Sequence, residues 1–549
     1  MYFRSQSLQV PAETIRVAQA AFPKGNNYMT MRDQINDIYA NSQFTHLFSH
    51  AGRSAEAPGR LALVLVMQYA EGLSDRQAAE AVRSRIDWKY ALALPLEDAG
   101  FVHGILSQFR ERLIAGGEEM LLLEDMLTRF NDLGLLSSSG KQRTDSTHIL
   151  AATRQLNRLE LVGETMRQAL EILATAYPNW LRQHLQPNWF DRYGVRFEEY
   201  RLPKTVKQRE ELAESIGQDG LYLMEQLLAY PITTGSYELP AMTTLSCIWR
   251  QQYYYDAEEG CLRWRGKEQG LPPGAKLIQT PYDVEARYSR KRDTEWTGYK
   301  VHLTETCDPE TPHLITHVET TLATVPDSEA LPQIHTSLLD NNCAPQTHLV
   351  DAGYIDADNL VNSAIDNIDL VGPALADTSW QGRDPDAFDL STFTFDWEAQ
   401  RATCPEGKES QVWSHSKNSF GAPVIHVRFA RNDCIACAQR IRCTRAVENP
   451  RSLKLYPQEQ HTALQIARKR QETDAFREEY KKRAGIEGTI SLGTRSFDLR
   501  RTRYIGLAKT HLHNVLVAAA INLTRVISWL RHKPRAQTRV SALANLAPA

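Results

Sequence analysis

The sequence lacks any apolar run that could cross a membrane, because a membrane-spanning helix needs about 20 mostly apolar residues in succession. The nearest candidate, residues 61–67, is far too short and is better interpreted as a buried helix. The first residues also lack the apolar core of a signal peptide. We therefore expect a cytoplasmic protein with no membrane partner.

The sequence has little net charge, −3, but this near balance hides an uneven distribution. Residues 440–549 hold 22 Lys and Arg against 8 Asp and Glu, so the remaining residues carry about −17. A basic C-terminal fifth on an acidic body indicates a surface that binds a polyanion. Solvated helix faces explain the charge density equally well.

Cysteines are few and unevenly spread. Four of the eight, Cys404, Cys434, Cys437 and Cys443, form a C-x29-C-x2-C-x5-C pattern. Four thiolates could hold a structural Zn²⁺ tetrahedrally, although the first gap is long and the second knuckle is irregular. Four reduced cysteines in a small subdomain are the alternative. The remaining four are interpreted as ordinary buried thiols: Cys247, Cys261, Cys307 and Cys343.

The first 135 or so residues have helical patterns. Residues 61–70 are apolar nearly all round, as in the central helix of a small bundle. Ser74 is a candidate N-cap of the next helix, 76–83, and a second helical run follows at 88–94. The arrangement resembles a helix-turn-helix, although the same pattern fits any helical bundle.

Strand patterns dominate later in the chain. A strand over 142–153 precedes a helical stretch over 154–246. Strands and helices then alternate, with strands at 299–306, 313–321, 348–354 and 369–373 and helices at 329–339 and 357–363. Hairpin strands followed by strand-helix-strand units predict a mixed sheet with helices packed on it. A polar, cysteine-bearing segment, a charged helix at 458–483 and a C-terminal helix at 510–530 follow.

Three acidic residues have positions suited to metal-dependent chemistry. Asp145 lies in the first predicted strand, Asp351 ends another, and Glu487 lies just beyond the charged helix. Carboxylates at the carboxyl ends of sheet strands face the crevice where α/β folds bind ligands. Three carboxylates brought together repel one another, and two Mg²⁺ ions about 4 Å apart would relieve the repulsion and suit in-line displacement at phosphorus. Taken singly, each acid could be a cap, a turn residue or an ion-pair partner.

These segments resemble bacterial insertion-sequence transposases of the Asp-Asp-Glu type, most closely the insertion-sequence group eleven-eighty-two. Residues 45–115, with Leu73-Ser-Asp-Arg-Gln-Ala-Ala, resemble the InsH-like N-terminal domain of these proteins. Three further segments resemble the first-acid motif, the second strand and the second-acid motif: Arg143-Thr-Asp-Ser-Thr-His, Gly298-Tyr-Lys-Val-His and Leu349-Val-Asp-Ala-Gly-Tyr. The resemblance covers almost the whole chain and implies an RNase H-like catalytic core.

The third-acid segment resembles a family signature of Tyr, Arg and Glu at fixed spacing, met here by Tyr480, Arg483 and Glu487. The last position of the signature, a Lys, is Thr494 here with Arg495 next to it, so the last basic contact is not assigned. The resemblance implies that the three acids bind two Mg²⁺ or Mn²⁺ ions and that Tyr480 and Arg483 hold the DNA backbone. Ordinary helix packing and solvation are the alternative for these two residues.

Two basic stretches with interleaved aromatic residues are expected to contact DNA phosphates. Such contacts position DNA without reading its sequence, so we expect the transposon ends to be read by the N-terminal helices. The predicted contacts are Arg287, Arg290, Lys291 and Arg292 in the first stretch and Arg495, Arg500, Arg501 and Arg503 in the second. The aromatic residues could equally be core contacts.

The expected fold is an α/β catalytic core, an RNase H-like mixed sheet flanked by helices, with a helical N-terminal domain, a helical insert and a small cysteine-bearing insert. The expected boundaries are 1–135 for the N-terminal DNA-binding domain, 136–153 for the first core strand, 154–281 for the helical insert, 282–375 for the continued core, 376–455 for the cysteine-bearing insert, 456–509 for the core helix with the third acid, and 510–549 for the C-terminal helix and tail.

The expected function is binding of the terminal inverted repeats of an insertion sequence, metal-dependent strand cleavage and strand transfer into target DNA. At least a dimer on double-stranded DNA is expected, because strand transfer needs two ends held together. No nucleotide cofactor is expected, and DNA binding would place the protein at the bacterial nucleoid. The alternatives are an RNase H-like nuclease or resolvase, and a domesticated transposase that only binds DNA. Inverted repeats flanking the gene would favour the transposase.

Overall fold

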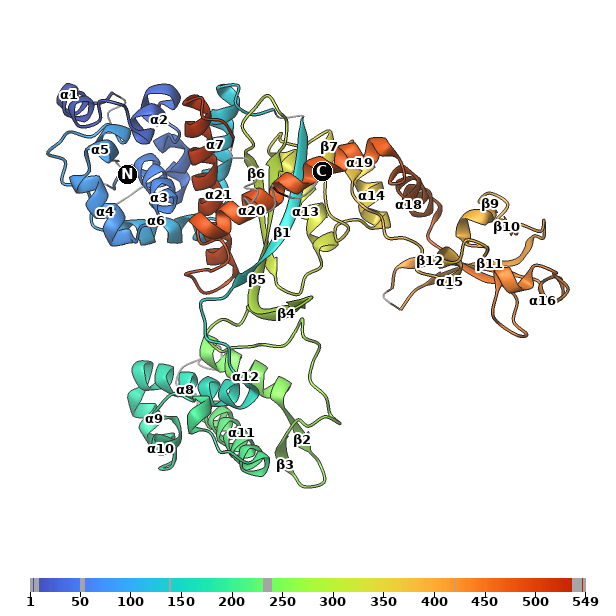
Figure 1. Ribbon diagram of the computed structural model, residues 1–549. Helices are drawn as coiled ribbons and strands as arrows, with labels where there is room; N and C mark the ends of the chain where they lie inside the picture. Colours follow the sequence, from blue (N-terminus) through green and yellow to red (C-terminus); the bar gives the residue numbers. More distant parts are fainter. Residues whose placement is uncertain are drawn as a thin grey trace.

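A six-stranded mixed sheet lies at the centre of the computed structural model, which describes residues 3, 9–49, 55–137, 140–230, 239–419, 421–535 and 546. Its strands are β1 (Lys141–Leu150), β4 (Arg287–Lys291), β5 (Thr294–Thr306), β6 (Ile315–Leu322), β7 (Thr347–Leu349) and β8 (Asp369–Val371). The order is β4-β5-β1-β7-β8, with β6 also paired to β5. β1 is antiparallel to β5 and parallel to β7, and β7 is parallel to β8. The predicted mixed sheet is confirmed, and it is compatible with an RNase H-like core (Figure 1).

Two predicted elements near the acids differ from the structure. The strand predicted over 348–354 ends at Leu349, because the chain turns at Asp351, whose carbonyl accepts from Tyr354 N–H at 3.2 Å. The helix predicted over 458–483 is divided into α18 (Gln458–Arg470), α19 (Asp474–Tyr480) and the 3-10 helix η5 (Lys481–Ala484). The division follows from Thr473, whose side chain caps α19 by accepting from Phe476 N–H.

The N-terminal helices share their main apolar core with the sheet. α3 (Pro58–Glu71) is buried along almost its whole length, and Ser74 caps α4 (Asp75–Ser84) as predicted. The last helix, α21 (Leu507–Leu530), packs against both α3 and β6 (Figure 1). The other helices of this region are α1 (Ala12–Ala21), α2 (Asn27–Ile35), η1 (Asn41–Leu47), α5 (Ile86–Ala91), α6 (Gly104–Ala115) and α7 (Leu121–Asp132).

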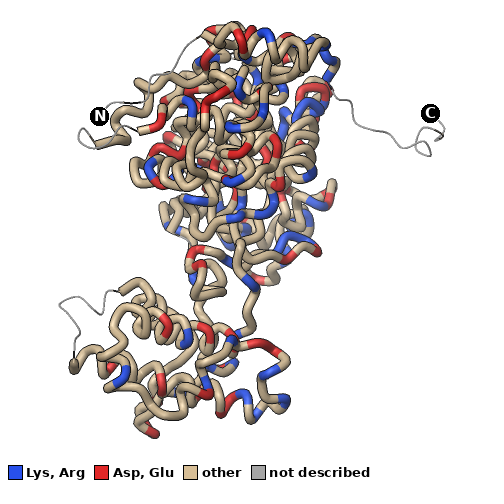
Figure 2. Tube along the Cα trace, turned by 90° about the vertical axis from the view of Figure 1, so that its left-hand side faces the viewer, with Lys and Arg blue, Asp and Glu red and all other residues tan. Residues whose placement is uncertain are grey.

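A helical body between β1 and β4 has an apolar core of its own and is joined to the sheet by a narrow connection (Figures 1 and 2). Gly163 and Gly220 allow close packing in it, because a Cβ at either would lie about 2.4 Å or less from an aromatic ring. Its elements are α8 (Arg158–Ala176), α9 (Pro178–His184), α10 (Trp189–Tyr193), η2 (Glu199–Arg201), α11 (Val206–Ala229), α12 (Pro240–Gln252), β2 (Tyr253–Asp256) and β3 (Cys261–Trp264).

A second projection, the cysteine arm (residues 380–455), extends from the side of the sheet that faces away from the N-terminal helices (Figure 1). It is built on the three-stranded sheet β11-β12-β13 and has a small core of its own. Its elements are α15 (Trp380–Arg383), η4 (Leu390–Thr392), β9 (Thr394–Asp396), β10 (Arg401–Thr403), β11 (Ser410–Lys417), β12 (Pro423–Phe429), α16 (Arg431–Ile435), α17 (Arg440–Cys443) and β13 (Ser452–Leu455). Within the described ranges, no helix is both long and apolar enough to span a membrane.

Candidate active site

Asp145 lies near the middle of β1 with its side chain only 12% exposed. Its Oδ1 accepts a hydrogen bond from Ser146 N–H at 2.8 Å. Burial raises the pKa of Asp145 to about 6, although the neighbouring Arg483 guanidinium opposes the shift. A carboxylate in such a place needs a nearby cation to hold its charged form.

Asp351 lies two residues beyond β7, at the carboxyl end of a strand that is parallel to β1. Gly353 N–H donates to Asp351 Oδ1 at 2.8 Å. A Cβ at Gly353 would come within 3.0 Å of that oxygen and within 3.3 Å of Asp327 Oδ2. Glycine therefore keeps a small space open between these two carboxylates.

Glu487 was expected just beyond the charged helix, in a core segment that carries the third acid, and it lies in the first turn of the next helix, α20 (Gly485–Ser496). The chain enters α20 directly from η5, because no residue between the two leaves helical geometry. The buried face of α20 is made by Ile486, Thr489, Ile490 and Gly493, which leaves the Glu487 side chain 65% exposed.

The guanidinium of Arg483 in η5 brings the three acids together. Its Nη2 lies 2.7 Å from an oxygen of Asp145 and 3.9 Å from one of Asp351, and its Nη1 lies 3.0 Å from Oε1 of Glu487. Three carboxylates from separate elements thus converge on one positive charge. The structure thus brings together Asp145, Asp351, Glu487 and Arg483, which are the three acids and the arginine predicted from the sequence.

The acids have the donor chemistry for a divalent metal, since Mg²⁺ and Mn²⁺ prefer carboxylate oxygens. Among the residues that the structure describes, no three His, Cys, Asp or Glu side chains are grouped closely enough to hold an ion. Two observations nevertheless fit a cation here. All three acids already approach one positive charge, the guanidinium of Arg483. Gly353 also leaves space beside Asp351.

Tyr480 is a packed residue at the end of α19. Its ring stacks on Phe476, with centroids 5.4 Å apart and planes 10° apart. Both rings lie against a small apolar cluster that includes Leu349 of β7 and Val371 of β8. Tyr480 thereby holds the start of η5, and so Arg483, over the strand ends that border the acids.

An ion pair that was not predicted borders the acids. Lys300 Nζ on β5 lies 2.6 Å from Oδ1 of Asp327, the first residue of α13 (Asp327–Asp340). Ser146 Oγ donates to the other oxygen of Asp327 at 3.1 Å. Lys300 lies in the segment Gly298-Tyr-Lys-Val-His, but its partner Asp327 has no distinguishing signal, because an acid in the first helical turn is common.

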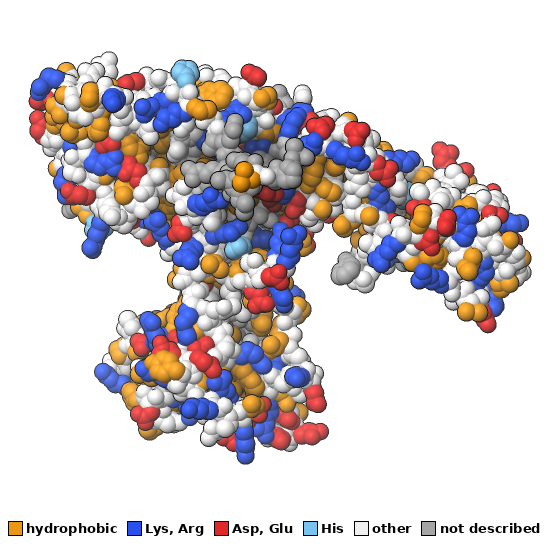
Figure 3. Space-filling model, viewed as in Figure 1, with side chains coloured by type: hydrophobic (Ala, Val, Ile, Leu, Met, Phe, Trp, Pro, Cys, Tyr) orange, Lys and Arg blue, Asp and Glu red, His pale blue; other side chains and the backbone are white. Residues whose placement is uncertain are grey.

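The first basic stretch forms β4 and the turn into β5. Arg287 donates to the backbone carbonyls of residues 275, 284 and 286, and Arg290 pairs with Glu295 at 3.5 Å. Lys291 and Arg292 are exposed, and Lys291 lies near enough to Asp145 to favour its charged form. Figure 3 shows Lys and Arg side chains, with several acidic ones, around the narrow connection beside β4.

The second basic stretch lies between β1 and the N-terminal helices. Arg500 Nε donates to Thr147 Oγ1 at 3.0 Å, and Arg503 lies over the Tyr69 ring, 5.9 Å from its centroid. The exposed members of the stretch are Arg495, Arg501 and Arg503. Thr494, at the signature's Lys position, donates its hydroxyl to the Ile490 carbonyl at 2.8 Å.

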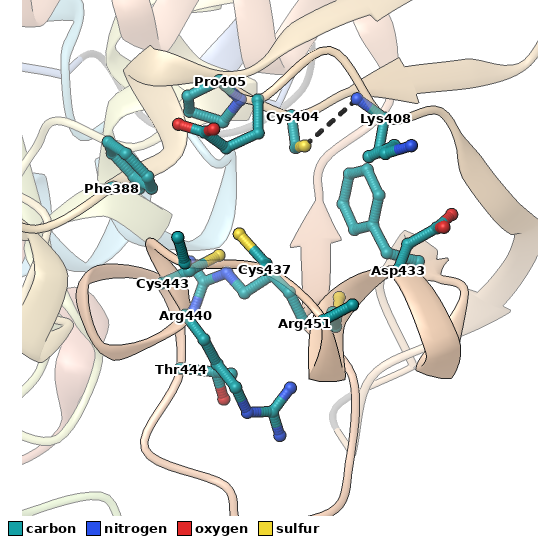
Figure 4. A pocket seen from close by; sticks show the side chains of 15 residues that line it. Phe388, Cys404, Pro405, Lys408, Asp433, Cys437, Arg440, Cys443, Thr444 and Arg451 are labelled. Atoms are coloured by element: carbon teal, nitrogen blue, oxygen red, sulfur yellow. Dashed lines mark hydrogen bonds between the residues drawn. The ribbon is translucent and has the colours of Figure 1, made fainter.

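The four clustered cysteines line one cavity of about 370 Å³ in the cysteine arm (Figure 4). Cys404 Sγ accepts from Lys408 N–H at 3.3 Å, and burial raises the pKa of the Cys443 thiol to about 11. Of the other cysteines, Cys307 and Cys343 are buried as predicted. The same prediction was wrong for Cys247 and Cys261, which are partly exposed.

Two protein-family models match the chain. The model of the transposase DDE domain matches residues 403–527, and the model of a transposase domain (DUF772) matches residues 16–112. Together the two matches support the interpretation of the chain as a DDE-type insertion-sequence transposase. No curated protein matches the chain.

The two matches cover different parts of the chain. The DDE-domain match holds the four clustered cysteines, Tyr480, Arg483 and Glu487, whereas Asp145 and Asp351 lie outside it. The other match covers the N-terminal helices from within α1 to α6. The link between Glu487 and the two aspartates therefore comes from the geometry around Arg483.

Proposed function

We propose that this transposase binds the terminal inverted repeats of its insertion sequence, cleaves DNA at the element ends and joins the freed 3′ ends to target DNA. The observation that carries the proposal is the convergence of Asp145, Asp351 and Glu487 on Arg483. One guanidinium balances one carboxylate, so the cluster keeps about two negative charges. That excess would be costly at a partly buried site and suits divalent cations.

The three acids would hold two Mg²⁺ or Mn²⁺ ions. Bound there, the ions would lower the pKa of an attacking water or 3′-hydroxyl and stabilise the leaving oxygen. Once the metal ions balance the charge of the acids, the guanidinium of Arg483 would be free to donate to a DNA phosphate. Tyr480 would keep η5 in place and present its hydroxyl beside the same phosphate.

Basic side chains on two sides of the acids would position the duplex. Lys291 and Arg292 lie at the β4–β5 turn, and Arg501 and Arg503 lie toward the N-terminal helices. Arg503 reaches the Leu73 carbonyl, 3.5 Å away, in the turn before α4. DNA held by this stretch would run beside α4, which we propose reads the end sequence, in at least a dimer that holds two ends.

The cysteine arm would hold a structural Zn²⁺. Its four cysteines all line one cavity and would supply four thiolates to a tetrahedral site once they close on the ion, since no three of the described side chains are yet grouped closely enough to hold one. The backbone N–H of Lys408 already donates to Cys404 Sγ, a bond that would support a thiolate. Zinc would stabilise a small body whose apolar core is limited to a few side chains.

The decisive test is cleavage of a labelled duplex that carries the inverted repeat flanking the gene, with Mg²⁺ or Mn²⁺. Asp351→Asn removes one proposed ligand and should abolish nicking at the element boundary while leaving duplex binding intact. Asp369→Asn is the matched control, because Asp369 lies in the neighbouring strand β8, exposed and paired with Arg470. A plasmid target added afterwards separates strand transfer from simple hydrolysis.

Each result has a distinct meaning. Nicking that requires metal and Asp351, followed by joining to the plasmid, supports the transposase. Nicking without joining or end preference indicates a nuclease, and specific binding without nicking indicates a DNA-binding relic. Equal cleavage by wild type and Asp351→Asn would mean that the active site lies elsewhere.

A further inference from the structure

A buried polar network lies behind the acids and joins four elements of the fold. It consists of Glu305 on β5, Arg143 on β1, Thr489 on α20 and Arg525 on α21, and we call it the Glu305 network. Glu305 is fully buried and Arg143 is almost so. None of these residues belongs to the predicted catalytic set.

Arg143 ties the network to Asp145. The two side chains lie on the same face of β1, because they are two residues apart in a strand. Arg143 is directly opposite Glu305 in the β1–β5 pairing, and its Nε donates to Glu305 Oε1 at 2.7 Å. A second nitrogen of Arg143 donates to the carbonyl of Lys482, in η5, at 2.6 Å.

Glu305 and Thr489 tie the network to α20. Thr489 Oγ1 donates to Glu305 Oε2 at 2.6 Å, and Arg525 Nη1 donates to the same oxygen at 2.8 Å. Burial works against the charge of Glu305, but Arg525 and Arg143 outweigh it and hold the pKa of the carboxyl below its usual value. Gly485 permits the approach, since a Cβ there would lie 2.0 Å from Arg143 Nη1.

The attachment points of the network bracket the third acid. Lys482 precedes Glu487 by five residues and Thr489 follows it by two, while Arg143 sits two residues before Asp145. Glu487 itself is 65% exposed, so packing of its own side chain does little to fix it. Glu305 therefore holds both segments at once, β1 through Arg143 and α20 through Thr489, behind the direct contacts that Arg483 makes with the two acids.

We propose that Glu305 is a positioning residue that sets Glu487 against Asp145 for metal binding. The inference rests on the proposed two-metal function and adds a residue outside the acids that controls metal affinity. Glu305 does not touch the ions or the DNA. Its removal would leave the buried Arg143 and the partly buried Arg525 without their carboxylate and would release the start of α20 from β1.

The test measures Mn²⁺ binding without DNA, by the electron paramagnetic resonance signal of free Mn²⁺, and DNA cleavage in parallel. Glu305→Gln keeps the shape and removes the charge, and Thr489→Val is a milder change that removes one donor. Glu56→Gln and Thr165→Val are matched controls. Glu56 pairs with Arg60 at 2.7 Å where both are buried, and the buried Thr165 hydroxyl donates to the Leu161 carbonyl.

Glu305→Gln is expected to weaken Mn²⁺ binding about 10- to 100-fold, the usual effect of losing support behind a metal ligand. Thr489→Val should weaken it by about tenfold or less, and it carries the test if Glu305→Gln does not fold. Saturating Mn²⁺ should restore part of the cleavage, and the affinity for the end duplex should stay within about threefold. The controls should lower the unfolding temperature and leave Mn²⁺ affinity unchanged.

Two failures can be told apart. Wild-type protein that neither binds Mn²⁺ nor cleaves DNA would overturn the proposed function and this inference with it. Active wild-type protein, with Glu305→Gln and Thr489→Val that bind Mn²⁺ equally well, would overturn the inference alone. The same conclusion would follow if the controls lost Mn²⁺ affinity in proportion to their loss of stability.

Discussion

Arg483 Nη2 donates to Asp145 Oδ2 at 2.7 Å, and this bond joins two residues that are 338 positions apart in the chain. The same guanidinium also contacts Glu487 and approaches Asp351. Arg483 is therefore the counter-ion of the acid cluster, and a divalent metal would compete with it for the same oxygens.

Arg483→Gln is expected to make the stability of the protein depend more strongly on metal. Without the guanidinium, the three carboxylates repel one another, and ions that bind only the folded state then stabilise it more. The rise in unfolding temperature on adding Mg²⁺ should be larger than in wild type, as measured by differential scanning fluorimetry. Cleavage at saturating Mg²⁺ should fall about 10- to 100-fold, because a charged phosphate contact is lost.

Arg477→Gln is the control for this variant. Arg477 is an exposed residue of α19 that pairs with Asp474. The substitution therefore removes one positive charge close to Arg483 in the sequence, without changing a contact to Asp145, Asp351 or Glu487. Its response to Mg²⁺ should match that of wild type. Equal Mg²⁺ responses of Arg483→Gln and Arg477→Gln would show that Arg483 does not compete with metal.

Local patterns in the sequence predicted much of the fold. The cap at Ser74 and the strand around Asp145 depend on near neighbours, and both were predicted correctly. The helix breaks before Glu487 were not predicted, because residues 458–483 contain neither proline nor glycine and the cap at Thr473 carries no stronger signal than other threonines.

Long-range contacts of the site could not be predicted in this way. Glu305 occupies the same strand face as Leu303 and Val301, and nothing in its neighbours shows that two arginines from distant elements balance its charge. Arg287 was predicted to contact DNA from its basic neighbours, yet its donors are turned to backbone carbonyls. Charge in a sequence does not show which cations remain exposed.

Lys291→Gln is expected to lower the salt dependence of DNA binding. Lys291 is exposed at the β4–β5 turn near the acids, and each phosphate contact contributes about 0.9 to the slope of log affinity against log salt concentration. The slope should fall by about that amount in fluorescence anisotropy titrations. Arg287→Gln should leave it unchanged, because its donors are engaged by carbonyls. A lower slope in Arg287→Gln, with an unchanged slope in Lys291→Gln, would place the DNA on the other side of β4.

Zinc in the cysteine arm is expected at about one ion per chain, bound by four thiolates in protein purified without chelator. Elemental analysis by mass spectrometry gives the stoichiometry. Cys437→Ser should lose the ion and expose the arm to proteolysis, because its core is small. Cys247→Ser, in α12 of the helical body, should keep both zinc and protection. Wild-type protein with no zinc and eight reactive thiols would favour four reduced cysteines.

Acid is expected to destabilise the folded protein through its buried histidines. His513 on α21 lies against Tyr69 of α3, with Nδ1 3.2 Å from the tyrosine oxygen, and burial lowers its pKa to about 4. The unfolded chain, with an ordinary histidine pKa near 6.5, binds the proton first, so the stability from this residue is present above about pH 6.5 and is lost as pH falls toward 4. At pH 5 the loss of stability is about 2 kcal/mol for this residue.

His513→Gln should therefore show a smaller fall in unfolding temperature between pH 7 and pH 5 than wild type. His415→Gln is the control, because His415 is exposed on β11, and its unfolding temperature should fall as much as that of wild type. An unchanged pH dependence in His513→Gln would show that the joint between α3 and α21 does not sense protons.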